Sequence, residues 1–211
     1  CPELLRYSGS RSARPFPAPY LMLPDRKQAQ DCQKRYDVVL AADLRGKGKM
    51  ANAVLEELAR LRKSTSRIGM FEMNSYHNSD APAAPLHMTS EAREAIWKAN
   101  IRILTFGEEV TCQQLILWNP VILQEHQRYL PTVRPETISI IVDDPALLSH
   151  DANGLLECAI SRADKMTRLY FDCKALWIPT GSEIRALLSN ASKTLDINIS
   201  AVDWPIASKM D

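Results

Sequence analysis

Residues 36–62, YDVVLAADLRGKGKMANAVLEELARLR, decide the fold of this 211-residue chain. The run DVVLAA at 37–42 is mostly apolar and predicts a buried strand. A short basic turn with two glycines follows, and residues 50–61 then carry apolar side chains at helical spacing. A strand that feeds a helix through a glycine turn is typical of a parallel α/β sheet.

The same alternation of strand and helix continues along the chain. Thr89 or Ser90 is expected to cap a helix at 91–98, and Thr180 with Glu183 is expected to form a capping box on the last helix. The strands and helices predict a Rossmann-like, doubly wound and mostly parallel sheet with helices on both faces. Strands are predicted at 37–42, 67–73, 101–106, 114–118, 137–142 and 175–178, and helices at 50–61, 91–98, 120–127, 153–170 and 179–188.

The composition, with 45% hydrophobic and 24% charged residues, is that of an ordinary globular protein. Residues 1–35 carry five of the 13 prolines and are expected to form an arm or linker, whereas residues 36–211 are expected to form one domain. The start at Cys1, without a methionine, indicates a piece of a longer chain. The five cysteines are an odd number at wide spacings, so neither a disulfide framework nor a zinc knuckle is expected.

The charge balance argues against two classes of partner. Lys and Arg together number 26 against 25 for Asp and Glu, so no overall field would draw the chain onto nucleic acid or an anionic membrane. No apolar run approaches the roughly 20 residues that cross a bilayer, and no signal peptide is visible at the N-terminus. We expect a cytoplasmic protein with no transmembrane segment and no nucleic-acid partner.

The basic turn between the first strand and the first helix is the main candidate for a binding site. Glycines at such a turn let backbone N–H groups approach a phosphate, and the helix dipole favours negative charge there. The turn holds Arg45, Gly46, Lys47, Gly48 and Lys49, which could bind the phosphates of a ligand. Alternatively, the glycines only permit positive φ and the lysines are solvated.

A dinucleotide is a second possible ligand of this turn. Gly46, Gly48 and Ala51 fit the G-x-G-x-x-G/A pattern, and Glu72 ends the second strand, where a carboxylate would bind the ribose. However, residues 43–45 separate the strand from the first glycine, which makes the turn longer than a dinucleotide turn usually is. The turn also lacks the Gly-Lys-Ser/Thr sequence of a P-loop.

Other polar residues follow predicted strands and supply candidates for catalysis and binding. His77 lies in a polar loop that could line a substrate site, and Asp144 follows the strand at 137–142; each could equally be solvated. Asn119 ends another strand, and Thr180 and Gly181 precede the last helix, so they could line the same cleft. The four histidines form no HExxH motif, and no metal site is expected.

Three segments, at 38–62, 115–145 and 176–188, resemble the N-terminal domain of bacterial glycosyltransferases of the GT-B type. In particular, they resemble family-4-like enzymes of cell-surface polysaccharide synthesis. In that group a strand and glycine turn open the domain, and later strands lead into turns that contain proline. The likeness covers most of the chain from Tyr36 onward, although its motifs are loose.

The resemblance implies that the chain is the acceptor-side half of a two-domain transferase. A second Rossmann-like domain of the same polypeptide would bind most of the nucleotide-sugar donor, and the turn at 45–49 would face the donor diphosphate. A sugar or glycan would be the acceptor, with Asp144 or His77 as the catalytic base. Neither an added cofactor nor a metal is expected, and the chain contains no Asp-x-Asp motif. The isolated chain would be inactive.

Two other functions stay open. The first is an NAD(P)-dependent oxidoreductase or epimerase domain that would use the glycine turn and Glu72. Against it, only Tyr170 is followed by lysine at the Tyr-x-x-x-Lys spacing of short-chain enzymes, and it ends a predicted helix instead of lying inside one. The second is a non-catalytic α/β interaction module, which an apolar surface patch would favour.

Overall fold

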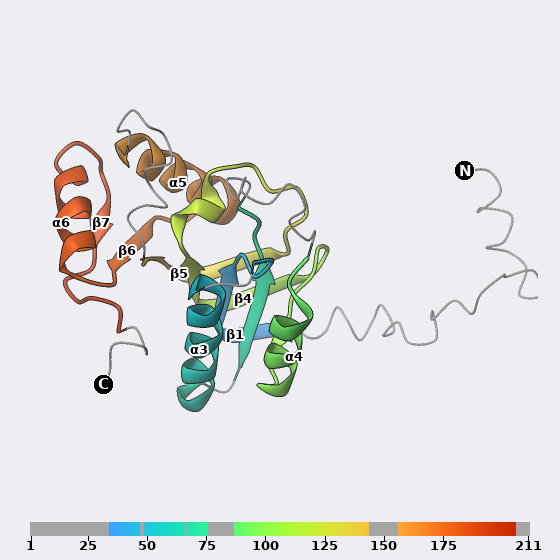
Figure 1. The fold of residues 1–211 in the computed structure, drawn as a ribbon. Coiled ribbons are helices and arrows are strands. Elements are labelled where there is room, and N and C mark those ends of the chain that lie inside the picture. The colour runs from blue at the N-terminus through green and yellow to red at the C-terminus, as the bar shows by residue number, and fades with distance from the viewer. Residues whose placement is uncertain (1–33, 47–48, 66, 76–86, 144–155, 206–211) are drawn as a thin grey trace, which may run out of the picture. The chain divides into compact units, whose positions relative to one another are not determined.

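The computed structural model describes residues 34–46, 49–65, 67–75, 87–143 and 156–205, which form a sheet with helices on both faces (Figure 1). The strands are β1 (Lys34–Ala42), β2 (Ile68–Glu72), β3 (Arg102–Ile103), β4 (Glu109–Trp118), β5 (Thr132–Val142), β6 (Ala175–Pro179) and β7 (Asn198–Ile199). The helices are α3 (Lys49–Ser64), α4 (Ser90–Lys98), α5 (Leu156–Phe171), α6 (Ser182–Ala191) and the 3-10 helix η3 (Pro120–Leu123).

The strand order is β3-β2-β1-β4-β5-β6-β7, and every neighbouring pair is parallel. From β1 the chain runs outward to β3, and it then crosses back to place β4 on the other side of β1. The first six strands therefore have the order of a Rossmann sheet, with the switch point between β1 and β4. The predicted fold class is confirmed.

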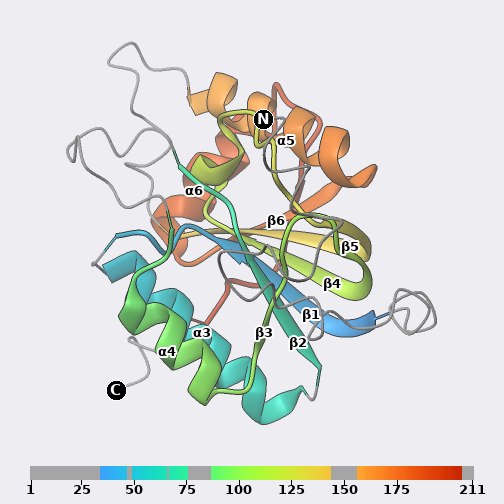
Figure 2. The ribbon, with the colours of Figure 1, turned by 90° about the vertical axis from the view of Figure 1, so that its right-hand side faces the viewer.

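The central strands read as nearly continuous apolar runs because both of their faces are covered. In β1, Val39 and Ala41 join the core on one face, while Val38 and Leu40 join the core on the other. Helices α5 and α6 pack on the first face, and α3 and α4 pack on the second (Figure 2). The helix α3 buries Ala51, Val54, Glu57, Leu58 and Leu61 against the sheet.

Several predicted boundaries differ from those in the structure. Strand β3 is only two residues long because the Thr105 N–H and Oγ1 both donate to Glu108, which turns the chain out of the sheet. The predicted helix at 120–127 is shortened to the single turn of η3. Strand β7 was not predicted, since two residues carry no readable alternation. Strand β1 begins at Lys34, inside the expected arm, and residues 1–33 lie outside the described part.

The two predicted helix caps had different outcomes. Thr89 caps α4 and accepts a hydrogen bond from the Ala92 N–H at 3.2 Å, as predicted. The capping box of Thr180 and Glu183 is wrong, because Gly181 is the N-cap of α6 and no side chain caps it. Instead, the Thr180 hydroxyl donates to the Val142 carbonyl at 3.0 Å, and so it ties the end of β6 to β5.

Candidate functional site

The candidate site lies at the carboxyl edge of the sheet, beside the switch point between β1 and β4. In an open parallel sheet, ligands bind outside the carboxyl ends of the strands at such a point. Asp43 directly follows β1, and Asn119 directly follows β4. The chain after each strand therefore decides what this edge can bind.

Asp43 is a buried carboxylate that organises the turn after β1. Its oxygens accept hydrogen bonds from Arg45 Nε at 3.0 Å and Nη2 at 2.7 Å, and from the Ser75 N–H and hydroxyl, both at 2.8 Å. Burial alone would raise the pKa of Asp43, but the hydrogen bonds from Arg45 and Ser75 outweigh burial and hold this pKa below its ordinary value. The ionised Asp43 side chain thus connects the end of β1 to the segment that follows β2.

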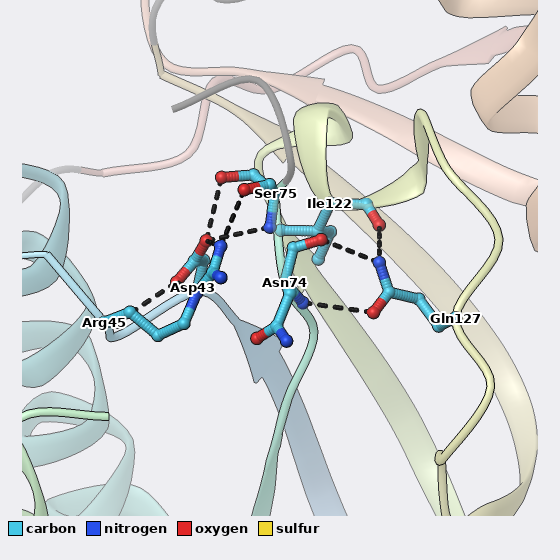
Figure 3. A network of polar contacts seen from close by, with 6 residues as sticks. All are labelled: Asp43, Arg45, Asn74, Ser75, Ile122 and Gln127. Atoms are coloured by element: carbon cyan, nitrogen blue, oxygen red, sulfur yellow. Dashed lines mark hydrogen bonds and ion pairs between the residues drawn. The ribbon is translucent and has the colours of Figure 1, made fainter. Parts of the chain in front are cut away.

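Arg45 faces into the protein rather than into solvent. Its side chain is 11% exposed, and Nη2 also donates to the Ser75 carbonyl at 2.6 Å (Figure 3). From the sequence, Arg45 is expected to balance the charge of a bound phosphate. The structure shows that the Asp43 carboxylate already balances this guanidinium, so its observed role is to hold the turn in place.

Gly46 is exposed and stands where the turn leaves this network. Its φ lies outside the left-handed region, and a Cβ at this position would meet no atom of the described residues within 4 Å, chain neighbours aside. The alternative that the glycine only permits positive φ is therefore wrong for Gly46. Lys47 and Gly48 lie outside the described residues, and Lys49 is the exposed first residue of α3.

The first turn of α3 differs in charge from those of the other described α-helices. The helices α4, α5 and α6 each carry a glutamate in their first turn, namely Glu91, Glu157 and Glu183. The helix α3 has no acidic residue there and begins with Lys49. Negative charge stabilises a helix N-terminus. In α3 no acidic side chain of the first turn supplies that charge, so a bound anion could supply it at the switch point.

Asn119 is fully buried and shapes the end of β4. Its backbone has φ 69°, its side-chain amide donates to Asp143 at 3.0 Å, and its side-chain oxygen accepts from the Val121 N–H at 3.2 Å. The Trp118 indole N–H also donates to Asp143, at 3.1 Å. Sequence reasoning placed Asn119 in the cleft, but the structure shows that its side chain instead joins the ends of β4 and β5.

A second network joins the end of β2 to the segment after η3. The Gln127 side chain accepts from the Asn74 N–H at 3.2 Å and donates to the Asn74 carbonyl at 2.7 Å (Figure 3). The Gln127 N–H donates to the Tyr170 hydroxyl at 2.5 Å, which connects the same segment to α5. Lys174 pairs with Asp196, so Tyr170 and Lys174 make separate structural contacts. The Gln127 contacts fix Asn74, which directly precedes Ser75.

Glu72, the last residue of β2, has an unusual environment. Its Oε1 atom is buried, and no described residue forms a hydrogen bond with it. Burial and the neighbouring Asp43 carboxylate raise the pKa of Glu72, whereas His87, Arg45 and a backbone hydrogen bond from Met88 oppose this shift. Glu72 also lines a pocket of about 390 Å³ beyond the ends of β2 and β3.

The remaining predicted site residues do not form one cluster in the described structure. Asp144 and His77 lie outside the described residues. Thr180 is buried against β5, and Gly181 is partly exposed at the start of α6. The polar loop that begins at Asn74 was identified from the sequence, but the roles of Asn74 and Ser75 were missed.

Comparisons with known proteins do not identify the chain. No known family model matches it, and a comparison with curated proteins finds no significant match. Within the described ranges, no three residues among His, Cys, Asp and Glu are grouped so that they could hold a metal ion. None of the helices seen in these ranges is both long enough and apolar enough to span a membrane.

Proposed function

We propose that this chain is the acceptor-side half of a nucleotide-sugar-dependent glycosyltransferase. A second Rossmann-like domain of the same polypeptide would hold most of the donor. The reaction would transfer a sugar from a nucleoside diphosphate to an acceptor hydroxyl, as in bacterial cell-surface polysaccharide synthesis. The single observation that carries the proposal is that α3, which begins at the switch point of the sheet, has no acidic residue in its first turn.

The start of α3 has the features that an incoming diphosphate requires. No atom of the described residues beyond the chain neighbours lies within 4 Å of a Cβ placed on Gly46, Lys49 adds a positive charge, and no acidic side chain occupies the first turn. An anion at a helix N-terminus is stabilised by the helix dipole and by backbone N–H groups that no carbonyl can reach. Charge that develops on the departing diphosphate would be stabilised in the same way.

The geometry supports a transferase more than a dinucleotide-binding enzyme. In a dinucleotide turn the first glycine directly follows the strand, whereas here Asp43 and Arg45 form an ordered ion pair between β1 and Gly46. Glu72 occupies the position of a ribose-binding carboxylate, but it has a raised pKa and lies beside a second carboxylate. The described lining of the pocket that holds Glu72 includes no residue of the turn after β1, so Glu72 and Gly46 do not share one pocket.

Thermal unfolding with added nucleotides tests the proposal. A ligand at one hundred times its dissociation constant adds about 2.7 kcal/mol, which raises the midpoint of a domain of this size by roughly 5 to 10 °C. We expect UDP or GDP to raise the midpoint and NAD to leave it unchanged. A shift with NAD would favour the oxidoreductase function, and no shift with any nucleotide would favour a non-catalytic module.

A variant at Gly46 makes this experiment specific to the turn. Because a Cβ at this position meets none of the described residues apart from its chain neighbours, Gly46→Val should leave the unfolding midpoint of the free protein unchanged. The added side chain would occupy the space through which a phosphate approaches the turn. We therefore expect Gly46→Val to abolish the shift caused by the nucleoside diphosphate, whereas Glu109→Gln, an exposed change at the start of β4, should preserve it.

A further inference from the structure

The pocket of about 390 Å³ lies beyond the ends of β2 and β3, where the segment at 126–131 faces them. Its volume is within the range of small-molecule sites, which is about 300–1,000 Å³. Its lining combines hydrogen-bonding side chains, among them Glu72, Asn74 and Thr105, with the aromatic rings of Phe106 and Tyr129. A concave site that combines hydrogen-bonding groups with apolar surface can orient one small molecule.

The polar end of the pocket holds groups that lack partners within the described chain. Glu72 has a buried oxygen without a hydrogen bond, and the Asn74 side-chain amide makes none with the described residues. Buried polar groups in proteins are almost always paired, so an unpaired one requires an explanation. A ligand that both donates and accepts hydrogen bonds would satisfy the carboxyl group and the amide together.

These groups are held in place by the two networks described above. The Gln127 side chain bonds both backbone groups of Asn74, and the adjacent Ser75 is fixed by Asp43. A site whose residues are already positioned loses little entropy when a ligand binds. The pocket is thus preorganised at its polar end.

The other end of the pocket is aromatic and open. Phe106 is 66% exposed and Tyr129 is 75% exposed, and their rings meet edge to face with centroids 5.5 Å apart. Exposed rings beside hydrogen-bonding groups suit a ligand with one apolar face and a rim of hydroxyls. Glu72, Arg128, His87 and His126 are the charged or titratable residues of the described lining. With histidine counted as neutral, the formal charges of Glu72 and Arg128 cancel, so the pocket does not select strongly for an anion.

We propose that this pocket binds one uncharged sugar ring, with hydroxyls on Glu72 and Asn74 and the apolar face of the ring on Phe106 and Tyr129. This inference rests on the proposed function, in which the ring is the terminal sugar of the acceptor. The site differs from the turn at Gly46, which would meet the donor diphosphate. It replaces Asn119 and Thr180, both buried, as the acceptor-binding residues.

Amide NMR with neutral sugars tests the pocket. The probes are glucose, galactose, mannose and N-acetylglucosamine, added separately to the whole chain. At least one should shift the amide signals of Glu72, Asn74, Thr105 and Gln127 in a saturable way. Glu72→Gln and Phe106→Ala should each weaken that binding by about ten-fold, because each removes a direct contact. Glu109→Gln, outside the pocket, is the matched control and should bind normally.

The outcomes separate this inference from the proposed function. If no sugar binds, if the shifts fall elsewhere, or if both pocket variants bind as well as the wild type, the pocket assignment is wrong. UDP or GDP added to the same samples should shift Gly46 and Lys49 in either case if the transferase function is right. Sugar binding without any nucleotide binding would keep the pocket and reject the transferase.

Discussion

Arg45 and Asp43 form a two-pronged ion pair at the end of β1, with Nε 3.0 Å from Oδ1 and Nη2 2.7 Å from Oδ2. Their side chains are 11% and 2% exposed, so water screens the pair little. Removing one partner of a buried pair leaves the other charge uncompensated. The pair should therefore be needed to hold the turn before α3.

Arg45→Met should lower the free energy of unfolding by about 3 kcal/mol, since it leaves the Asp43 carboxylate buried with fewer donors. Urea unfolding at neutral pH measures this loss. Arg35→Met is the control, because Arg35 pairs with Glu136 on the surface and both side chains are more than 60% exposed. That change should cost less than about 1 kcal/mol. Equal effects of the two variants would contradict the structural role of Arg45.

The contribution of the Asp43 carboxylate to the free energy of unfolding should disappear in acid. Its pKa is lower in the folded protein than the ordinary value of 3.8, so the unfolded chain binds the proton more readily. The stabilisation is present above pH 3.8 and is lost as pH falls through the lower folded pKa. Asp43→Asn should therefore be less stable than wild type at pH 6, and this difference should narrow as the pH falls below about 4. A difference that stayed constant with pH would show that the charge is unimportant.

The contribution of Glu72 to stability should depend on pH in the opposite direction to that of Asp43. Its pKa is raised above the ordinary value of 4.5, so its stabilising contribution is complete below pH 4.5 and is lost as pH rises through the folded pKa. Glu72→Gln should consequently stabilise the protein at pH 7, by on the order of 1 kcal/mol, while binding sugar less well. Urea unfolding at pH 4 and pH 7 would measure the change. Destabilisation at pH 7 would contradict the account of this site.

Two substitutions of Asn119 should separate the energetic cost of its positive φ from the contribution of its side-chain hydrogen bonds. Asn119→Ala removes the bonds to Asp143 and Val121 and keeps a Cβ at φ 69°, so it should cost roughly 2 to 4 kcal/mol. Asn119→Gly removes the same bonds but tolerates positive φ, and it should cost about 1 kcal/mol less. If glycine proved no better than alanine, backbone strain at this position would be negligible.

Thiol labelling offers a check on the sheet itself. Burial raises the pKa of Cys112 to about 12, so this β4 thiol should resist iodoacetamide at pH 8 until urea unfolds the chain. Cys158, which is exposed on α5, should react in the native protein. Peptide mapping by mass spectrometry distinguishes the two sites. Rapid native labelling of Cys112 would mean that β4 is not buried as described.

The fold could be predicted from the sequence because its signals are local. The strand at 37–42, the glycine turn and the amphipathic helix follow each other within one short stretch, and the period of each is readable. The short strand β7 has too few residues for any period. It is a strand only because it pairs with β6, and the sequence near Asn198 does not indicate this pairing.

The site was harder to predict because its contacts join distant residues. Ser75 bonds Asp43 across 32 positions, and Gln127 bonds Asn74 across 53. Arg45 appeared available for a ligand in the sequence, since nothing local shows that Asp43 accepts its hydrogen bonds. The sequence suggests Glu72 only as a ribose-binding carboxylate, because its raised pKa depends on burial and on Asp43, which only the folded chain brings together.

Acceptor-dependent release of a nucleoside diphosphate tests the central claim most directly. The protein would be the complete polypeptide encoded by the reading frame, supplied with UDP- or GDP-linked sugars and glycan acceptors. We predict release that needs an acceptor, falls at least about ten-fold in Gly46→Val and is unchanged in Glu109→Gln. No release with any nucleotide sugar, or full activity of Gly46→Val, would contradict the assignment of the α3 turn to a glycosyltransferase donor site.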